Sequence, residues 1–117
     1  MIRFSFCAVL AFGLLSGCAS DPAPTEQLRL TEQAISQARA VGADEQVAEL
    51  TLADDKLAQA QAAMLDEAHK DARVLAEQAE LDARLAEARV LTQKSQGQLL
   101  ELNNRINRLR QQLGELP

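Results

Sequence analysis

Cys18 is the residue whose type and surroundings point most directly to a chemical reaction. It follows Leu15, Ser16 and Gly17 at the end of an apolar run. A cysteine sulfur is a nucleophile that can take up a diacylglyceryl group. The small side chains of Ser16 and Gly17 leave the peptide bond before the cysteine accessible to a peptidase. The residue types therefore make the sulfur of Cys18 a candidate for acylation and the peptide bond before it a candidate for cleavage.

The segment before Cys18 has the layout of a secretory signal. Arg3 supplies positive charge, residues 4–15 are mainly apolar, and polar sequence resumes at Ser20. A membrane-spanning helix needs about 20 consecutive apolar residues, which this segment does not reach. Residues 15–18 resemble the lipobox of bacterial lipoproteins. We therefore predict a lipoprotein signal peptide over residues 1–17 and a lipidated tether over residues 18–24.

The residues after Cys18 bear on the membrane to which the lipid is sent. Ala19 follows the cysteine directly, so there is no aspartate there, and Ser20 and Asp21 come next. By resemblance to the sorting rules of bacterial lipoproteins, this favours the periplasmic side of the outer membrane.

His69 is the single histidine of the chain and the one candidate for other chemistry. It lies three residues after Asp66, which resembles half of a carboxylate-bridged metal site on a helix. Such a site needs a second histidine and further carboxylates, so we predict no metal and no cofactor. Neither a Ser-His-Asp arrangement nor a glycine-rich phosphate loop is present in the sequence. The residues therefore predict no enzyme.

A short polar cluster near the C-terminus is the locally basic part of the sequence. Residues 94–117 carry four basic and two acidic residues. One reading is contact with an anionic surface such as peptidoglycan or phospholipid head groups, and the other is the hydrated face of a coiled coil. The cluster comprises Asn103, Asn104, Arg105, Asn107, Arg108 and Arg110.

Composition predicts an all-α protein. Every aromatic residue precedes Cys18, and residues 18–117 are rich in Ala, Leu, Gln, Glu and Arg, which are typical of long helices. With Arg3 removed, the net charge becomes −6, which argues against nucleic acid as a partner because nucleic-acid binding needs a basic surface. Only one cysteine remains after processing, so no internal disulfide is expected.

Helical periodicity predicts two helices before residue 66. The first spans about residues 25–41, with Thr25 as its N-cap and Gly42 as its stop. The second spans about residues 45–66, with Asp44 as its N-cap. No Gly or Pro follows directly, so the sequence leaves open whether a turn near Glu67 separates this helix from the next. The predicted buried positions are Leu28, Thr31, Ile35, Ala38, Leu50, Ala53, Leu57, Ala60 and Met64.

The third predicted helix begins near Ala72 and carries two apolar rows. The first row, which we name the alanine seam, allows close approach of another helix and comprises Ala72, Ala76, Ala79, Ala83, Ala86 and Val90. The second row, which we name the leucine seam, has coiled-coil spacing and comprises Leu81, Leu85, Ala88, Thr92, Ser95, Leu99, Leu102, Ile106, Leu109, Leu113 and Leu116. Thr92, Ser95 and Gly97 weaken its middle, where a hinge is an alternative to a straight helix.

The third predicted helix is too long to be covered by the first two. From Ala72 to Leu116 it would measure about 65 Å, more than the two shorter helices can cover. The part after Thr92 must therefore project beyond the bundle or find a helix from another chain. We predict that Leu99, Leu102, Ile106, Leu109 and Leu113 bind a partner or a second copy.

Two stretches carry a resemblance to a known family. The first comprises Gly42-Ala43, Glu49-Leu50 and Ala53-Asp54-Asp55-Lys56-Leu57-Ala58, and the second comprises residues 75–86. Both resemble small proteobacterial envelope lipoproteins whose helical module has no known function. In some relatives an OmpA-like peptidoglycan-binding domain follows the module. The resemblance implies an envelope lipoprotein.

Together these features predict three helices over residues 25–117, with an antiparallel hairpin and a long C-terminal coiled-coil helix. The function expected of such a chain is that of an outer-membrane lipoprotein serving as a scaffold or adaptor through the leucine seam. The alternative is a non-covalent peptidoglycan-binding module that uses the Asn/Arg cluster.

Overall fold

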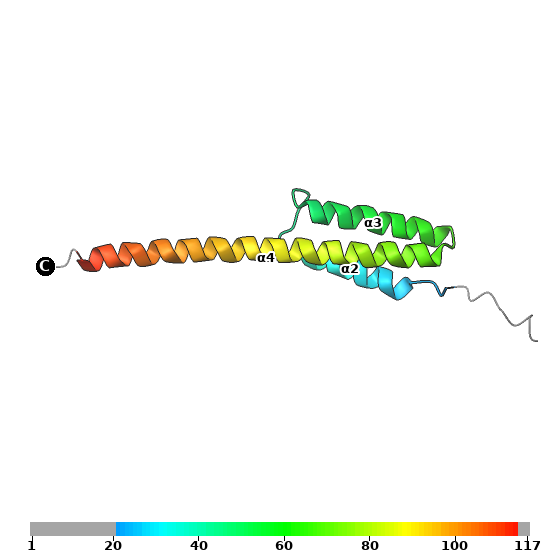
Figure 1. Cartoon of the computed structure of the whole chain (residues 1–117), viewed down its shortest axis with the longest axis horizontal. Helices are drawn as coiled ribbons and strands as arrows, with labels where there is room; N and C mark the ends of the chain where they lie inside the picture. The colour runs from blue at the N-terminus through cyan, green and yellow to red at the C-terminus, as the bar shows by residue number, and fades with distance from the viewer. Residues whose placement is uncertain (1–20, 115–117) are drawn as a thin grey trace, which may run out of the picture.

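The computed structural model describes residues 21–114 and is all-α over that range. Helix α2 (Thr25–Ala40) and helix α3 (Ala48–Leu65) lie beside the first half of a long helix α4 (His69–Gly114). Helices α3 and α4 form an antiparallel hairpin, and α2 runs parallel to α4 (Figure 1). The predicted three-helix arrangement with a long C-terminal helix is confirmed. In residues 21–114, no helix is long and apolar enough to cross a membrane.

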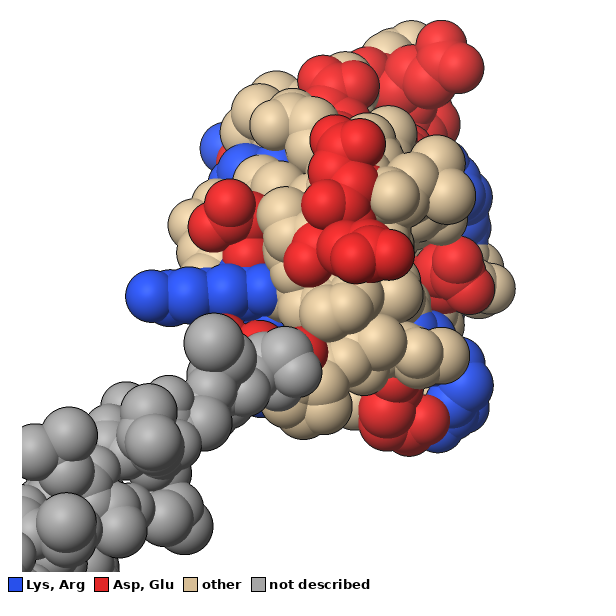
Figure 2. All heavy atoms as spheres, turned by 90° about the vertical axis from the view of Figure 1, so that its right-hand side faces the viewer, with Lys and Arg blue, Asp and Glu red and all other residues tan. Residues whose placement is uncertain are grey.

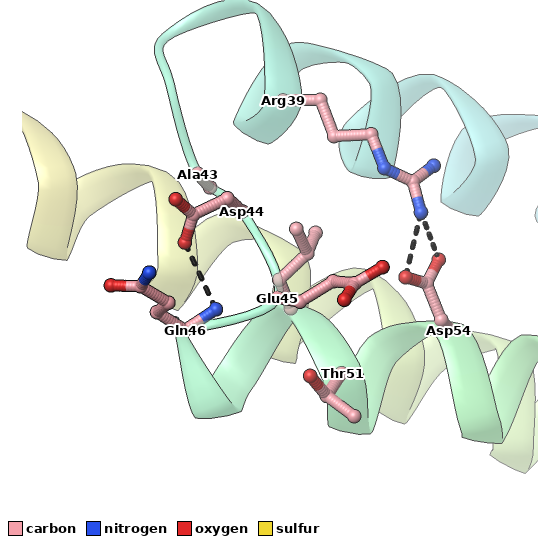
Figure 3. A pocket seen from close by; sticks show the side chains of 8 residues that line it. Arg39, Ala43, Asp44, Glu45, Gln46, Thr51 and Asp54 are labelled. Atoms are coloured by element: carbon pink, nitrogen blue, oxygen red, sulfur yellow. Dashed lines mark hydrogen bonds and ion pairs between the residues drawn. The ribbon is translucent and has the colours of Figure 1, made fainter.

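Helices α2 and α3 begin differently from the prediction. Thr25 lies inside the first turn of α2, and the N-cap is Pro24, whose carbonyl accepts a hydrogen bond from the Leu28 N–H (3.0 Å). The prediction of Asp44 as the N-cap of α3 is also wrong, because that helix starts four residues later. The Asp44 carboxylate instead accepts a hydrogen bond from the Gln46 backbone N–H (2.9 Å), which closes a turn within the loop (Figure 3).

Both short helices end in the same hydrogen-bonded cap. After α2, the Gly42 N–H bonds to the Arg39 carbonyl and the Ala43 N–H reaches back to the Ala38 carbonyl. After α3, the N–H groups of residues 67 and 68 bond in the same pattern to the carbonyls of residues 64 and 63. This is the Schellman motif, whose second residue past the helix takes a left-handed conformation. A turn therefore separates α3 from α4, with Glu67 in the position that glycine usually fills.

Glu67 has a φ of 58°, so its Cβ is crowded in a conformation that costs non-glycine residues about 1 kcal/mol or more. Glu67→Gly should therefore raise the free energy of unfolding by about 0.5–1 kcal/mol, as measured by urea denaturation. Glu67→Ala removes the same charge but keeps the Cβ, and it should give no such gain. Equal stability of the two variants would contradict this assignment of strain.

The core is built around the alanine seam. All six of its residues are buried, and Ala72, Ala76, Ala79, Ala83 and Ala86 have no exposed surface. Methyl side chains let α2 and α3 approach α4 closely, and the larger Ile35 and Leu50 fill the space beside them. The alanine seam is thus confirmed as the packing face of α4, as are the predicted buried positions Thr31, Ala38, Ala53 and Ala60. Leu28, Leu57 and Met64 are only half-buried, so their prediction as buried positions is wrong.

Polar contacts fix the register of α2 and α3 on α4. The hydroxyl of Thr31, fully buried, lies 2.9 Å from the Ala76 carbonyl oxygen and 2.9 Å from the Gln27 carbonyl oxygen. Between α3 and α4, the ammonium of Lys56 pairs with the Asp82 carboxylate at 2.6 Å, and both side chains are largely shielded from solvent. These contacts add directional constraints to a core made mostly of small apolar side chains.

Glu80 joins α2 to α4 through its carboxylate. It accepts hydrogen bonds from Gln27 of α2 (2.7 Å) and from Arg84 (2.5 Å). The bonds from Arg84 and Gln27 favour the charged form and lower the pKa of Glu80. A lowered pKa in the folded state contributes stability above the unfolded pKa, which is lost as the pH falls through the folded value.

The stability difference between about pH 7 and about pH 3 should therefore be smaller in Glu80→Gln than in the parent chain. Urea denaturation at the two pH values measures it. The matched control is Glu87→Gln, because Glu87 is a half-buried residue of α4 whose carboxylate makes no hydrogen bond to α2 within residues 21–114. An unchanged pH dependence in Glu80→Gln would show that this carboxylate does not contribute.

Candidate interaction surface

Helix α4 extends beyond the bundle core by about half its length. It contains 46 residues, about 69 Å, whereas its last buried residue is Val90. Every residue from 91 to 114 is exposed, and the helix passes through Gly97 without interruption, so there is no hinge at that position (Figure 1). We name residues 91–114 the tip.

The five residues predicted to bind a partner lie on one face of the tip. Their exposed fractions are 60% for Leu99, 51% for Leu102, 37% for Ile106, 52% for Leu109 and 68% for Leu113. Their steps of three and four residues bring them into line, as the sequence predicted. Leu116 lies outside the described residues, as does Cys18.

The leucine seam is separate from the bundle core. Ala83 and Leu85 are two residues apart and so point about 200° apart around the helix, and Leu85 is 55% exposed while Ala83 is buried. Beyond Val90, the positions that would continue the alanine seam are mostly polar or small: Gln93, Gly97, Leu100, Asn104, Asn107 and Gln111. The apolar row of α4 thus changes face where α2 and α3 no longer cover it.

Sequence reasoning missed one end of this surface. Val74 is 44% exposed and lies seven residues before Leu81, so it extends the leucine seam along the outer face of the bundle. The seven-residue step was readable in the sequence, but Gln78 interrupts the apolar pattern between the two. Leu91, at 46% exposure, widens the seam on one flank, whereas Leu100, at 66% exposure, lies on the other face of the tip in line with the alanine seam.

Charge divides the molecule into an acidic bundle and a basic tip. Residues 21–90 carry 15 acidic and 7 basic residues, whereas residues 91–117 carry four basic and two acidic ones. Figure 2, which looks at the end of the bundle with the α3–α4 turn, shows Asp and Glu side chains across its middle and Lys and Arg toward its margins. In the tip, Arg105 pairs with Glu101 at 3.1 Å.

A hollow of about 530 Å³ lies where the loop between α2 and α3 meets both helices. Its one cation, Arg39, binds both carboxylate oxygens of Asp54 at 2.8 and 2.7 Å, so each charge is matched by the other (Figure 3). This ion pair connects α2 to α3. The hollow therefore supports the fold and offers no unpaired cation to a ligand.

The candidate metal ligands are not gathered into a site. His69 begins α4, directly after the turn that contains Asp66, and its Nδ1 is buried with no hydrogen-bond partner in the described part of the chain. Within residues 21–114, no three His, Cys, Asp or Glu side chains lie close enough together to hold a metal ion.

The bundle corresponds to a known protein family. The family model described as a domain of unknown function, DUF4398, matches residues 26–102, which include the whole bundle and the first part of the tip. The chain belongs to the DUF4398 family. No curated protein matches it.

A crystal structure of a DUF4398 family protein from Pseudomonas aeruginosa is similar to this chain, with 68% sequence identity and a TM-score of 0.78. The similarity covers 80% of this chain and 98% of that one. Ile106, Leu109 and Leu113 lie beyond the part that the DUF4398 model matches.

Proposed function

We propose that this DUF4398 protein is a lipid-anchored periplasmic protein of the outer membrane that acts as a structural or interaction module through its leucine seam. The observation that carries the proposal is the exposed row Leu99, Leu102, Ile106, Leu109 and Leu113 on a helix that projects beyond its own bundle. Rows of leucine at this spacing bury themselves against another helix.

The positions of the chain ends agree with an anchored module. Helix α2 begins beside the start of α4, where Arg73 donates a hydrogen bond to the Pro22 carbonyl (3.2 Å), and the tip lies at the far end of α4 (Figure 1). Cys18 precedes the first described residue by three positions. A lipid on Cys18 would therefore hold the bundle at the membrane and direct the tip away from it.

Cys18→Ser tests the anchor. Serine offers no thiol, so the variant should carry no lipid and should leave the membrane fraction almost completely, as measured by mass spectrometry of the N-terminus and by fractionation of cells. Cys7→Ser is the matched control, because that cysteine lies inside the apolar run that we expect to be removed. A Cys18→Ser protein that stays lipidated and membrane-bound would exclude this anchor.

The alternative function is non-covalent binding of peptidoglycan by the Asn/Arg cluster. It is favoured by Arg108 and Arg110, which are exposed and have no ion-pair partner within residues 21–114. Sedimentation with purified peptidoglycan separates the two functions. The alternative requires that changing Arg105, Arg108 and Arg110 to Ala abolishes sedimentation and that Leu102→Asp with Leu109→Asp preserves it.

A further inference from the structure

The residues that flank the leucine seam on the tip carry one sign of charge. In heptad terms, Leu99, Ile106 and Leu113 occupy the a positions, and Leu102 and Leu109 occupy the d positions. The flanking e and g positions from residue 98 to residue 112 are Gln98, Asn103, Arg105, Arg110 and Gln112. Both charged flanking residues are arginines. Glu101, the one acid of the described tip, lies at position c and forms an exposed ion pair with Arg105 (3.1 Å), whereas Arg110 has no ion-pair partner within residues 21–114.

These flanks disfavour a second copy of the chain as the occupant of the seam. Copies anchored through the same end to one membrane would direct their tips the same way, so their helices would pair in parallel. In a parallel pair, each g residue faces the e residue five positions later on the other helix. Arg105 of one copy would then face Arg110 of the other, twice per pair, and like charges so placed are repulsive.

The lower part of the seam adds polar layers instead of further repulsion. Arg84 and Arg89 occupy the g and e positions beside Leu85 and Ala88, but each is paired with a carboxylate of its own chain, Glu80 at 2.5 Å and Glu49 at 2.6 Å. Thr92 and Ser95 would place two polar layers in the shared core of a parallel pair. These layers, together with the two Arg105–Arg110 contacts, oppose the burial of the leucines against their own copies.

A helix with acidic flanks meets none of these obstacles. Its carboxylates would face Arg105 and Arg110, and its apolar row would cover Leu99 to Leu113, about 21 Å of the tip. The bundle, with 15 acids against 7 bases over residues 21–90, repels the same helix. The charge distribution therefore directs an acidic helix to the tip and away from the lower seam.

We propose that the tip binds an amphipathic helix of another protein, whose apolar a and d rows are flanked by Asp or Glu. The occupant of the seam is thus a partner chain of complementary charge and not a second copy. This inference rests on the proposed function, since it assigns the partner class of the same surface.

Two synthetic helical peptides of about three heptads test it. Both carry Leu and Ile at the a and d positions, and one carries Glu and the other Lys at e and g. Fluorescence anisotropy with the full chain measures both dissociation constants. We expect the Glu peptide to bind at least about tenfold more tightly than the Lys peptide, with a difference that shrinks as salt is added. Arg105→Glu with Arg110→Glu should reverse the order, and Arg108→Glu, on the outer side, should leave it unchanged.

Each other result has a defined meaning. Equal binding of the two peptides would overturn the charge selection and leave the seam as an interaction surface. A chain that sediments alone as a dimer at the same concentration would identify a second copy as the occupant and overturn the proposal. Absence of binding by either peptide to a monomeric chain would overturn both this inference and the proposed function.

Discussion

Leu102→Asp together with Leu109→Asp should abolish association through the leucine seam while leaving the bundle as stable as before. Both side chains are about half exposed in the isolated chain, so their removal costs the fold little. In a complex they would be buried, and each leucine contributes about 1.5–3 kcal/mol when buried. Loss of both, with a carboxylate placed in each core layer, should weaken association by at least about a hundredfold.

Photo-crosslinking in cells measures this effect. A photoreactive group at position 99 would link the tip to its binding partner. The parent chain should give a crosslinked product that disappears in the double variant. Asn104→Asp with Gln111→Asp is the matched control, because it adds the same two charges at the same spacing on the far side of the helix. Thermal denaturation of all three proteins should coincide. A product that persists in the leucine variant would exclude the seam as the binding surface.

Ala83→Leu should cause the largest loss of stability of any single change considered. Ala83 has no exposed surface and lies in the core cluster between α4 and its neighbours. A leucine there cannot fit without separating the helices, and overpacking of a close-packed core costs about 1–3 kcal/mol. A small domain has little stability to lose, so the melting temperature should fall by on the order of 10 °C.

Ala58→Leu provides the matched comparison, since Ala58 is exposed on α3 and leucine is nearly as good a helix former as alanine. Its melting temperature should stay close to that of the parent chain. Circular dichroism measures the thermal unfolding of both variants. Because the tip is also helical and contributes to that signal, limited proteolysis is used to follow the unfolding of the bundle alone. Equal melting temperatures for Ala83→Leu and Ala58→Leu would show that the alanine seam is not the tightly packed face of α4.

Much of the fold was predictable because helical periodicity is a local property. The rows that contain Ala83 and Leu102 follow from residue spacing alone, and both lie where that spacing placed them, one buried and one exposed. The length of the last helix also follows from sequence, since no helix breaker occurs between Ala72 and Gly97. The projection of the tip is then a matter of comparing lengths.

Helix boundaries depended on more than local signals. Asp44 has a side chain typical of a helix N-cap, yet its carboxylate accepts a hydrogen bond from the Gln46 N–H within the loop, and α3 begins only at Ala48. Glu67 occupies a left-handed turn for which the sequence offers no glycine. Packing of α3 along the alanine seam requires a reversal there, and that burial outweighs the local cost of about 1 kcal/mol.

The sequence by itself determined that this chain is helical, that its last helix carries two apolar rows, and that Cys18 follows a stretch that resembles a lipobox. The tertiary structure decided which row would be free. Helices α2 and α3 both occupy the alanine side of α4, because methyl groups permit close approach there, and the last residue they bury is Val90. The leucines of the tip consequently remain exposed, since no residue described in this chain reaches far enough to cover them.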